Sequence, residues 1–305
     1  MPQTLGGIDA GGLERSRTRR SDSIRFGPSA HGIERAEVYL STCEFEPHRH
    51  DTYAIGITTA GVQTFHYRGL RHICLPGQLH VLHPDEAHDG AAGTDGGFGY
   101  RILYIPPELV REALAGRALP FVADPIQQLV PAARLIASLL ADIDEPINEL
   151  SSAEIAVAVA DGLVSLSGHP DRRKAAIDTR AVELARDYLA AHAREQTSAS
   201  ILEKIAGTDR FTIARHFRWA FGTSPDRYRT LRRLALARAA IESGQSLARA
   251  ASEAGFADQS HMTRQFKRTY GLTPGRWMAL TADSSRETGA RAPSRLPAKS
   301  VPGAV

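Results

Sequence analysis

The 305-residue sequence lacks the features that mark several classes of protein. It has only two cysteines, Cys43 and Cys74, in or beside apolar segments, which predicts buried free thiols in a reducing compartment rather than a disulfide. No apolar run approaches the roughly 20 residues that a membrane-spanning helix needs, and no apolar core follows the N-terminal charges as in a signal peptide. These absences predict a cytoplasmic protein with no membrane partner.

Motifs of catalysis are also missing. The sequence has no glycine-rich phosphate loop after a strand, no paired carboxylates and no nucleophile–base pair. We therefore expect a binding protein and not an enzyme.

Charge is distributed unevenly behind a net value of +3. Residues 178–282 carry 17 Lys and Arg against 10 Asp and Glu, whereas residues 28–177 carry 11 against 19. A basic C-terminal half joined to an acidic N-terminal half predicts that the basic part approaches a polyanion. A solvated basic face without a partner is the simpler alternative.

Two kinds of periodicity divide the chain. Apolar and polar side chains alternate between Gly and Pro turns, which predicts short strands at residues 36–40, 53–57, 62–67, 79–82 and 100–104. Many short strands at this spacing predict a small β-barrel or jelly roll. Helical spacing follows at residues 109–114, 135–140 and 155–166, and these apolar stripes can pack on the barrel or pair two copies of the chain.

The remaining segments complete the domain plan. Composition and periodicity predict a disordered arm at residues 1–27, a folded N-terminal domain at 28–168, a linker at 169–177, an all-helical domain at 178–282 and a disordered tail at 283–305. Predicted helices of the last domain include residues 178–192, 210–221 and 225–242.

One stretch of the helical domain has the pattern of a DNA-reading helix. Gly255 ends a short helix and Asp258 can cap a new one, whose residues Met262 and Phe266 begin an apolar stripe at a spacing of four. The other side carries groups suited to base edges and phosphates, namely Gln259, Ser260, Thr263, Arg264 and Lys267. Helix, glycine turn and polar-faced helix predict a helix-turn-helix.

The pattern occurs twice. Residues 215–225 and residues 264–274 share the motif Arg-x-Phe-basic-x-x-aromatic-Gly-x-Ser/Thr-Pro, each after a short helix and a turn. The predicted helix between the two units spans roughly 27 Å at about 1.5 Å per residue. With turns added, the units can lie near the ~34 Å that separates successive major-groove faces.

These motifs resemble the AraC/XylS family of bacterial transcription regulators, closely over residues 178–282. The run from Gly255-Phe256 through Arg264-Gln265-Phe266-Lys267 to Gly271-Leu272-Thr273-Pro274 is similar to that family's most specific signature. More loosely, the N-terminal half resembles the cupin-type sensor domain common in the family. The resemblance implies an α+β, two-domain protein: a cupin-like sensor and an all-α domain with two helix-turn-helix units.

The resemblance also implies the positions that read DNA. They are Arg210, Phe211, Ala214 and Arg215 in the first unit, and Gln259, Ser260, Thr263 and Arg264 in the second. Ala214 is too short to bond a base, and Phe211 can only touch a thymine methyl. We therefore expect the second unit to carry most base discrimination, and we expect Arg232 and Lys267 to contact phosphate.

Histidines are concentrated in the N-terminal half. His48 and His50 share a face if their segment is a strand, and His88 follows downstream. A cupin metal site adds a carboxylate a few residues after such a pair, but Ala54 and Ile55 stand there. We therefore expect no metal and no cofactor. We predict instead an effector pocket lined by His48, His50, Tyr53, His80, His88 and Tyr104.

The sequence thus predicts a cytoplasmic, ligand-responsive regulator whose partners are double-stranded promoter DNA and a small-molecule effector. Two copies of the chain can pair, and RNA polymerase becomes a partner if the protein is an activator. The alternative is a metal-dependent cupin enzyme with an accessory helical domain, which a metal ion lost on substitution of His48 and His50 would favour.

Overall fold

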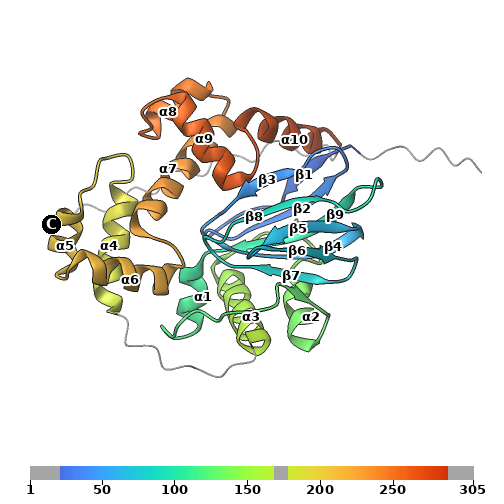
Figure 1. Cartoon of the computed structure of the whole chain (residues 1–305), viewed down its shortest axis with the longest axis horizontal. Helices are drawn as coiled ribbons and strands as arrows, with labels where there is room; N and C mark the ends of the chain where they lie inside the picture. Colours follow the sequence, from blue (N-terminus) through green and yellow to red (C-terminus); the bar gives the residue numbers. More distant parts are fainter. Residues whose placement is uncertain (1–20, 168–177, 288–305) are drawn as a thin grey trace, which may run out of the picture.

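A computed structural model describes residues 21–167 and 178–287 (Figure 1). In this part of the chain, an N-terminal domain of two β-sheets and three helices precedes a C-terminal domain of seven helices. Helices α9 and α10 lie on one side of the sheets, and α2 and α3 lie on the other (Figure 1). The predicted two-domain α+β class is confirmed.

The strands form two antiparallel sheets. The first has the order β1 (Ser23–Phe26), β2 (Glu34–Leu40), β9 (Phe98–Ile105), β4 (Tyr53–Gly61), β7 (Leu79–Leu82) and β10 (Ile126–Gln127). The second has the order β3 (Phe45–His48), β8 (His88–Ala92), β5 (Gln63–Tyr67) and β6 (Leu70–Cys74). No pairing joins the two sheets into one closed ring among the described strands, so the expected barrel is an open sandwich.

All five predicted strands are present, and the prediction missed β1, β3, β6, β8 and β10. The disordered arm predicted at residues 1–27 is wrong for β1, which pairs with β2 from Ser23–Tyr39 to Phe26–Ala36. Its Ile24 is buried, and its Phe26 ring lies 5.4 Å from that of Trp277. Burial against a distant helix therefore orders a strand whose own sequence is too short to predict it.

Three helices follow the strands: α1 (Pro107–Ala113), α2 (Pro131–Ser138) and α3 (Glu149–Ser167). They pack on one face of the first sheet, where Ile55, Val81 and Leu103 join Ile136 and Val159 in one core. Helix α3 is long and apolar enough to cross a membrane by length and composition alone. Its buried face in this core accounts for that composition as the core helix of a folded domain.

The C-terminal domain contains α4 (Thr179–Ala191), α5 (Ala199–Ala206), α6 (Arg210–Phe221), α7 (Pro225–Glu242), α8 (Leu247–Glu253), α9 (Gln259–Tyr270) and α10 (Pro274–Glu287). The predicted bounds of α6 and α7 are confirmed. Helix α10 runs to Glu287, so the predicted tail is wrong for residues 283–287. The rest of that tail, residues 1–20 of the arm and the predicted linker lie outside the described residues.

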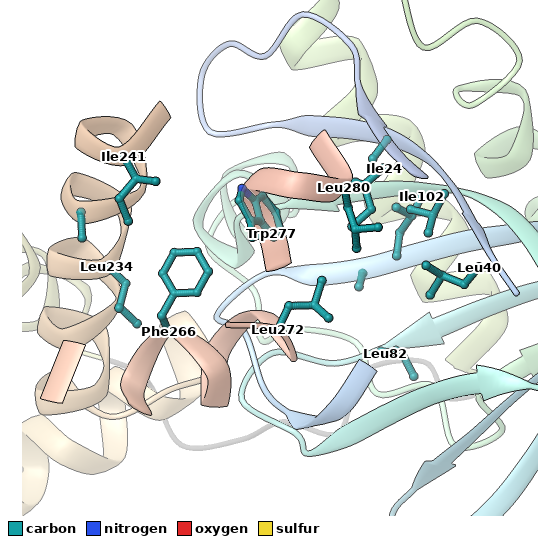
Figure 2. Close-up of a cluster of buried hydrophobic side chains, with 14 of the residues drawn as sticks. Ile24, Leu40, Leu82, Ile102, Leu234, Ile241, Phe266, Leu272, Trp277 and Leu280 are labelled. Carbon is teal, nitrogen blue, oxygen red and sulfur yellow. The ribbon is translucent and has the colours of Figure 1, made fainter. Parts of the chain in front are cut away.

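The two helix-turn-helix units belong to different cores. The first, α5–α6, packs with α4 and the start of α7 around Leu189, Phe217 and Phe221. The second, α8–α9, shares one core with the sandwich. In this core Leu280 of α10 lies beside the sheet residues Ile24 and Ile102, and Phe266 of α9 lies near Leu234 of α7 (Figure 2). The second unit is therefore built into the sensor domain, whereas the first has a core of its own.

Candidate functional site

Both candidate DNA-reading helices begin at an aspartate cap. Asp209 accepts hydrogen bonds from the backbone N–H groups of Phe211 and Thr212, both at 3.0 Å, and Asp258 accepts one from His261 at 2.6 Å. Such caps satisfy N–H groups that the first helical turn leaves unpaired. The predicted cap at Asp258 is confirmed, and it fixes where the polar face of α9 begins.

In the first unit, the four predicted reading residues are exposed but not equally available. Both ends of the Arg210 guanidinium are bonded to Glu203 of α5, with Nε to Oε1 at 2.8 Å. Phe211 is 73% exposed, and Ala214 and Arg215 are exposed beside it. Arg210 thus ties α5 to α6, and Arg215 is the remaining cation among the four predicted reading residues.

In the second unit, Gln259, Ser260 and Arg264 are exposed, and Thr263 is half-buried. The Lys267 ammonium is 2.7 Å from the carboxylate of Glu46 on β3, so this predicted phosphate contact touches the sensor domain. Arg232 is further from the expectation: it bonds Asp51 at 2.6 Å and lies in a cavity wall. Its place on the inner face of α7 explains the difference, because helical periodicity alone does not say which side of a connecting helix meets another domain.

A cavity of about 270 Å³ opens between the two domains. Its sandwich wall includes apolar side chains such as Ile24, Val38, Phe65, Leu82 and Ile102, and α7, α9 and α10 supply Leu231, Arg232, Ala235, Arg238, Thr269, Tyr270 and Trp277. The volume is far larger than one water molecule requires, and the walls are mainly apolar with a few polar groups.

Five of the six predicted effector residues line this cavity: His48, His50, His80, His88 and Tyr104. Tyr53 does not, because successive residues of a strand point to opposite faces of the sheet. Ala54 faces the cavity-side core, whereas Tyr53 packs under α1–α3 with its ring 5.2 Å from that of His83. The prediction of Tyr53 as a pocket residue is therefore corrected.

Three of these histidines form a cluster. One ring nitrogen from each of His48, His50 and His88 lies within 4.8 Å of the other two. Each Nδ1 lies within hydrogen-bond distance of a backbone carbonyl: that of Glu46 at 2.7 Å, Thr52 at 3.0 Å and Glu86 at 3.1 Å respectively. A carbonyl can only accept, so each Nδ1 carries the proton.

Burial keeps these imidazoles neutral. It lowers the pKa of His48 well below its usual value, that of His50 to about 3 and that of His88 to about 4, with the neighbouring rings adding to the effect on His48 and His50. Burial likewise lowers the pKa of His80 to about 3, and its buried Nδ1 has no hydrogen-bond partner among the described residues. The cavity therefore offers neutral nitrogen acceptors at physiological pH.

Ion pairs between the domains frame the cavity. Arg232 pairs with Asp51, and Arg238 pairs with Glu34. Nearby carboxylates hold the pKa of both guanidinium groups above its ordinary value despite burial. The sequence prediction missed Arg232, Arg238 and Trp277 as cavity residues, because no local pattern reports a contact between distant segments.

Strand β3 also binds the end of α9 directly. The N–H of Glu46 donates to the carbonyl of Gly271 at 3.1 Å, and that of Arg49 donates to the carbonyl of Arg268 at 2.9 Å. Gly271 has φ +71°, and a Cβ there would lie 2.8 Å from Nδ1 of His48. A side chain would therefore meet both backbone strain and the ring of a cavity histidine.

Comparison with known proteins agrees with this architecture. Residues 30–159 match the AraC-like ligand binding domain family, and residues 202–279 match a helix-turn-helix domain family. An uncharacterised HTH-type transcriptional regulator of Bacillus subtilis, YbfI, is 25% identical over 230 residues, which cover 72% of this chain and 82% of YbfI.

The solved structure of ToxT from Vibrio cholerae superposes with a TM-score of 0.59 at 11% identity, over 82% of this chain and 99% of ToxT. A second ToxT structure, with a bound unsaturated fatty acid, gives a TM-score of 0.56 at 11% identity, over 88% and 98% of the two chains. At this identity the likeness shows the fold alone.

The protein is therefore a ligand-responsive, DNA-binding transcription regulator and not an enzyme. It belongs to the AraC/XylS family, with a cupin-like sensor domain followed by a double helix-turn-helix domain.

Proposed function

We propose that a small-molecule effector bound in the interdomain cavity controls how α9 is presented to promoter DNA. The observation that carries this proposal is the composition of the cavity wall, to which both domains contribute. A ligand held between two bodies has a different affinity for their closed and open arrangements. That difference is the condition for a ligand to shift an equilibrium between states.

The contacts between β3 and α9 provide the route. His48 lines the cavity at the end of the same strand whose Glu46 N–H bonds the C-terminal end of α9. The polar face of α9 bears Gln259, Ser260, Thr263 and Arg264, which we propose as the principal base-reading residues. Phe211, Ala214 and Arg215 of α6 position the first unit on the DNA. Arg210 joins them when its guanidinium leaves the carboxylate of Glu203 and binds DNA instead.

We propose an effector with an apolar body and an acidic group. ToxT has been solved with an unsaturated fatty acid and with (E)-4-(8-methylnaphthalen-1-yl)but-3-enoic acid, both of which combine these features. In this chain, Val38, Phe65 and Ile102 would cover an apolar body, while Arg232 and Arg238 carry the positive charges of the wall. His80 adds an unpaired Nδ1 for a polar substituent.

Titration of a long-chain cis-unsaturated fatty acid, below its micelle concentration, tests this assignment. Ala235→Phe places a ring in the cavity mouth, whereas Leu236→Phe places one on an exposed position of the same helix that does not line the cavity. The Ala235 variant should lose the fatty-acid-dependent change in affinity for DNA upstream of the gene, and the Leu236 variant should keep it. An equal response in both variants would refute an effector site in this cavity.

We also propose that two chains pair through α3. Its buried face packs in the domain core, while a second stripe leaves Leu150, Val157 and Val164 exposed at helical spacing, with Leu135 of α2 beside a groove that includes Val157. Sedimentation of Val157→Glu should show a monomer where the wild-type chain is a dimer. A wild-type monomer both free and on DNA contradicts this proposal.

We propose the cytoplasm as the location of the protein, and RNA polymerase as a further partner if the regulator is an activator.

A further inference from the structure

We propose that His48, His50 and His88 form a binding site for a divalent transition-metal ion, with Zn²⁺ the preferred ion, on the wall of the interdomain cavity. The sequence argued against a metal because the carboxylate of the usual cupin site is missing. The structure gives an argument that does not depend on that carboxylate, namely how the three rings are held.

The first step is the orientation of the imidazoles. Each Nδ1 is bonded to a backbone carbonyl, of Glu46, Thr52 or Glu86, which leaves Nε2 of each ring as the remaining nitrogen. Metal-ligating histidines almost always donate their other N–H to such a partner, which fixes both tautomer and ring direction. All three rings of the cluster share this arrangement, although His88 comes from a different segment of the chain than His48 and His50.

The second step is the mutual contact of the rings. Their centroids lie 4.3 Å apart for His48 and His88, and 4.8 Å apart for His50 and His88. With Nδ1 protonated and the ring neutral, each Nε2 is an acceptor only. Three hydrogen-bond acceptors cannot bond one another. A cation between them can accept a lone pair from all three nitrogens at once.

The third step is the charge of the surrounding wall. Besides the neutral histidines, the cavity is lined by three carboxylates, Glu34, Asp51 and Asp89, and by two guanidinium groups, Arg232 and Arg238. Asp51 and Glu34 are already paired with these arginines. The wall therefore has no excess positive charge to repel a divalent cation. A bound cation would add positive charge to the wall and so attract the acidic group of an effector.

The ion follows from the ligand set. Neutral imidazole suits Zn²⁺, Cu²⁺, Fe²⁺ and Ni²⁺, and a tetrahedral Zn²⁺ held by three histidines keeps one open position. All three rings line the cavity, so that position is available to a molecule inside it. Zn–N bonds of about 2.0 Å require the nitrogens to lie about 3.3 Å apart. Binding would therefore draw the rings closer than the 4.8 Å limit of the cluster.

Metal binding to the purified, untagged full-length chain tests the site without DNA or fatty acid, and so independently of the function proposed above. After chelation and dialysis, Zn²⁺ should bind at one ion per chain in isothermal titration, and Co²⁺ should give the visible absorption of a tetrahedral site. His50→Gln and His88→Ala should lower the affinity by more than the 10–100-fold that loss of an outer-shell partner costs.

His72→Ala is the matched control. His72 is also half-buried in the sandwich, with one ring nitrogen bonded to a backbone carbonyl, but it does not line the cavity. This variant should bind Zn²⁺ like the wild type and show the same rise in melting temperature on adding the ion. The proposal fails if the wild type does not bind one ion, or if folded His50→Gln binds it as tightly as the wild type.

Discussion

Phe217 and Phe266 occupy the same place in the repeated motif, and both side chains are fully buried, yet they belong to different cores. Phe217 contacts Phe221 of the first helix-turn-helix unit and Tyr228 at the start of α7, with ring centroids 4.5 and 5.5 Å away. Phe266 packs against Tyr270 and Trp277 in the core that includes the sandwich. One motif thus builds a reader with a core of its own in the first unit and a reader that shares a core with the sensor domain in the second.

The motif glycines show the same contrast. Gly222 and Gly271 end α6 and α9 in the left-handed region, with φ +70° and +71°. Both approach the sensor domain closely, since a Cβ on Gly222 would lie 2.6 Å from Pro84 and one on Gly271 would lie 2.8 Å from His48. Only the second of these neighbours lines the cavity. A change at the cavity therefore reaches α9 more directly than α6.

The largest expected effect comes from truncating the two phenylalanines. Phe217→Ala and Phe266→Ala should each lower the free energy of unfolding by about 3–5 kcal/mol, because each leaves a void in a tightly packed core. Only Phe266→Ala should also weaken binding of the fatty acid, because the void left by the missing ring adjoins Trp277 and Tyr270, which line the interdomain cavity. Urea unfolding and ligand titration measure the two effects. Equal loss of ligand binding in both variants would remove the distinction between the units.

The arginines that begin the repeated motif, Arg215 and Arg264, should distinguish the two units by a smaller effect. Arg264→Ala should lower affinity for the preferred site by about 1–3 kcal/mol and relax the preference at one base pair. Arg215→Ala should weaken binding to all sequences alike if the first unit mainly positions the protein. Fluorescence anisotropy with single-base variants of the upstream DNA distinguishes the two outcomes. Loss of base preference in Arg215→Ala would transfer the reading role to α6.

Local patterns predicted most of the elements but not how they meet. The bounds of α6 and α7 follow from Asp209, Pro225 and the aromatic spacing, all of which act within a few residues. The five missed strands are only two to five residues long, and their pairing partners supply the stabilisation.

The candidate sites show the same division. His48, His50, His80, His88 and Tyr104 could be selected from composition and spacing, whereas Tyr53 required the side of β4 to be known. Arg232 was expected to contact DNA phosphate, but it bonds Asp51 of the sensor domain. Its role depends on where α7 meets the sandwich, which the sequence of α7 does not show. Contacts between residues almost 200 positions apart leave no periodic signal in the sequence.

The smallest expected effect concerns the basic residue of each repeated motif, Arg218 in α6 and Lys267 in α9. Lys267 pairs with Glu46, whereas its counterpart Arg218 is exposed with no ion-pair partner in the described part of the chain. Glu46→Gln removes a largely exposed pair and should change stability by less than about 1 kcal/mol. It should nevertheless free Lys267 for phosphate and steepen the salt dependence of DNA binding by about 0.9 in log–log slope.

Glu44→Gln provides the control for this last comparison, because it removes the same charge from an exposed position two residues away without an ion-pair partner among the described residues. Its salt slope should equal that of the wild type. Arg218→Ala should flatten the slope with or without fatty acid, since none of the described sensor residues pairs with that cation. If Glu46→Gln and Glu44→Gln give the same slope, Lys267 does not exchange between the sensor and DNA, and α9 is coupled to the cavity through backbone contacts alone.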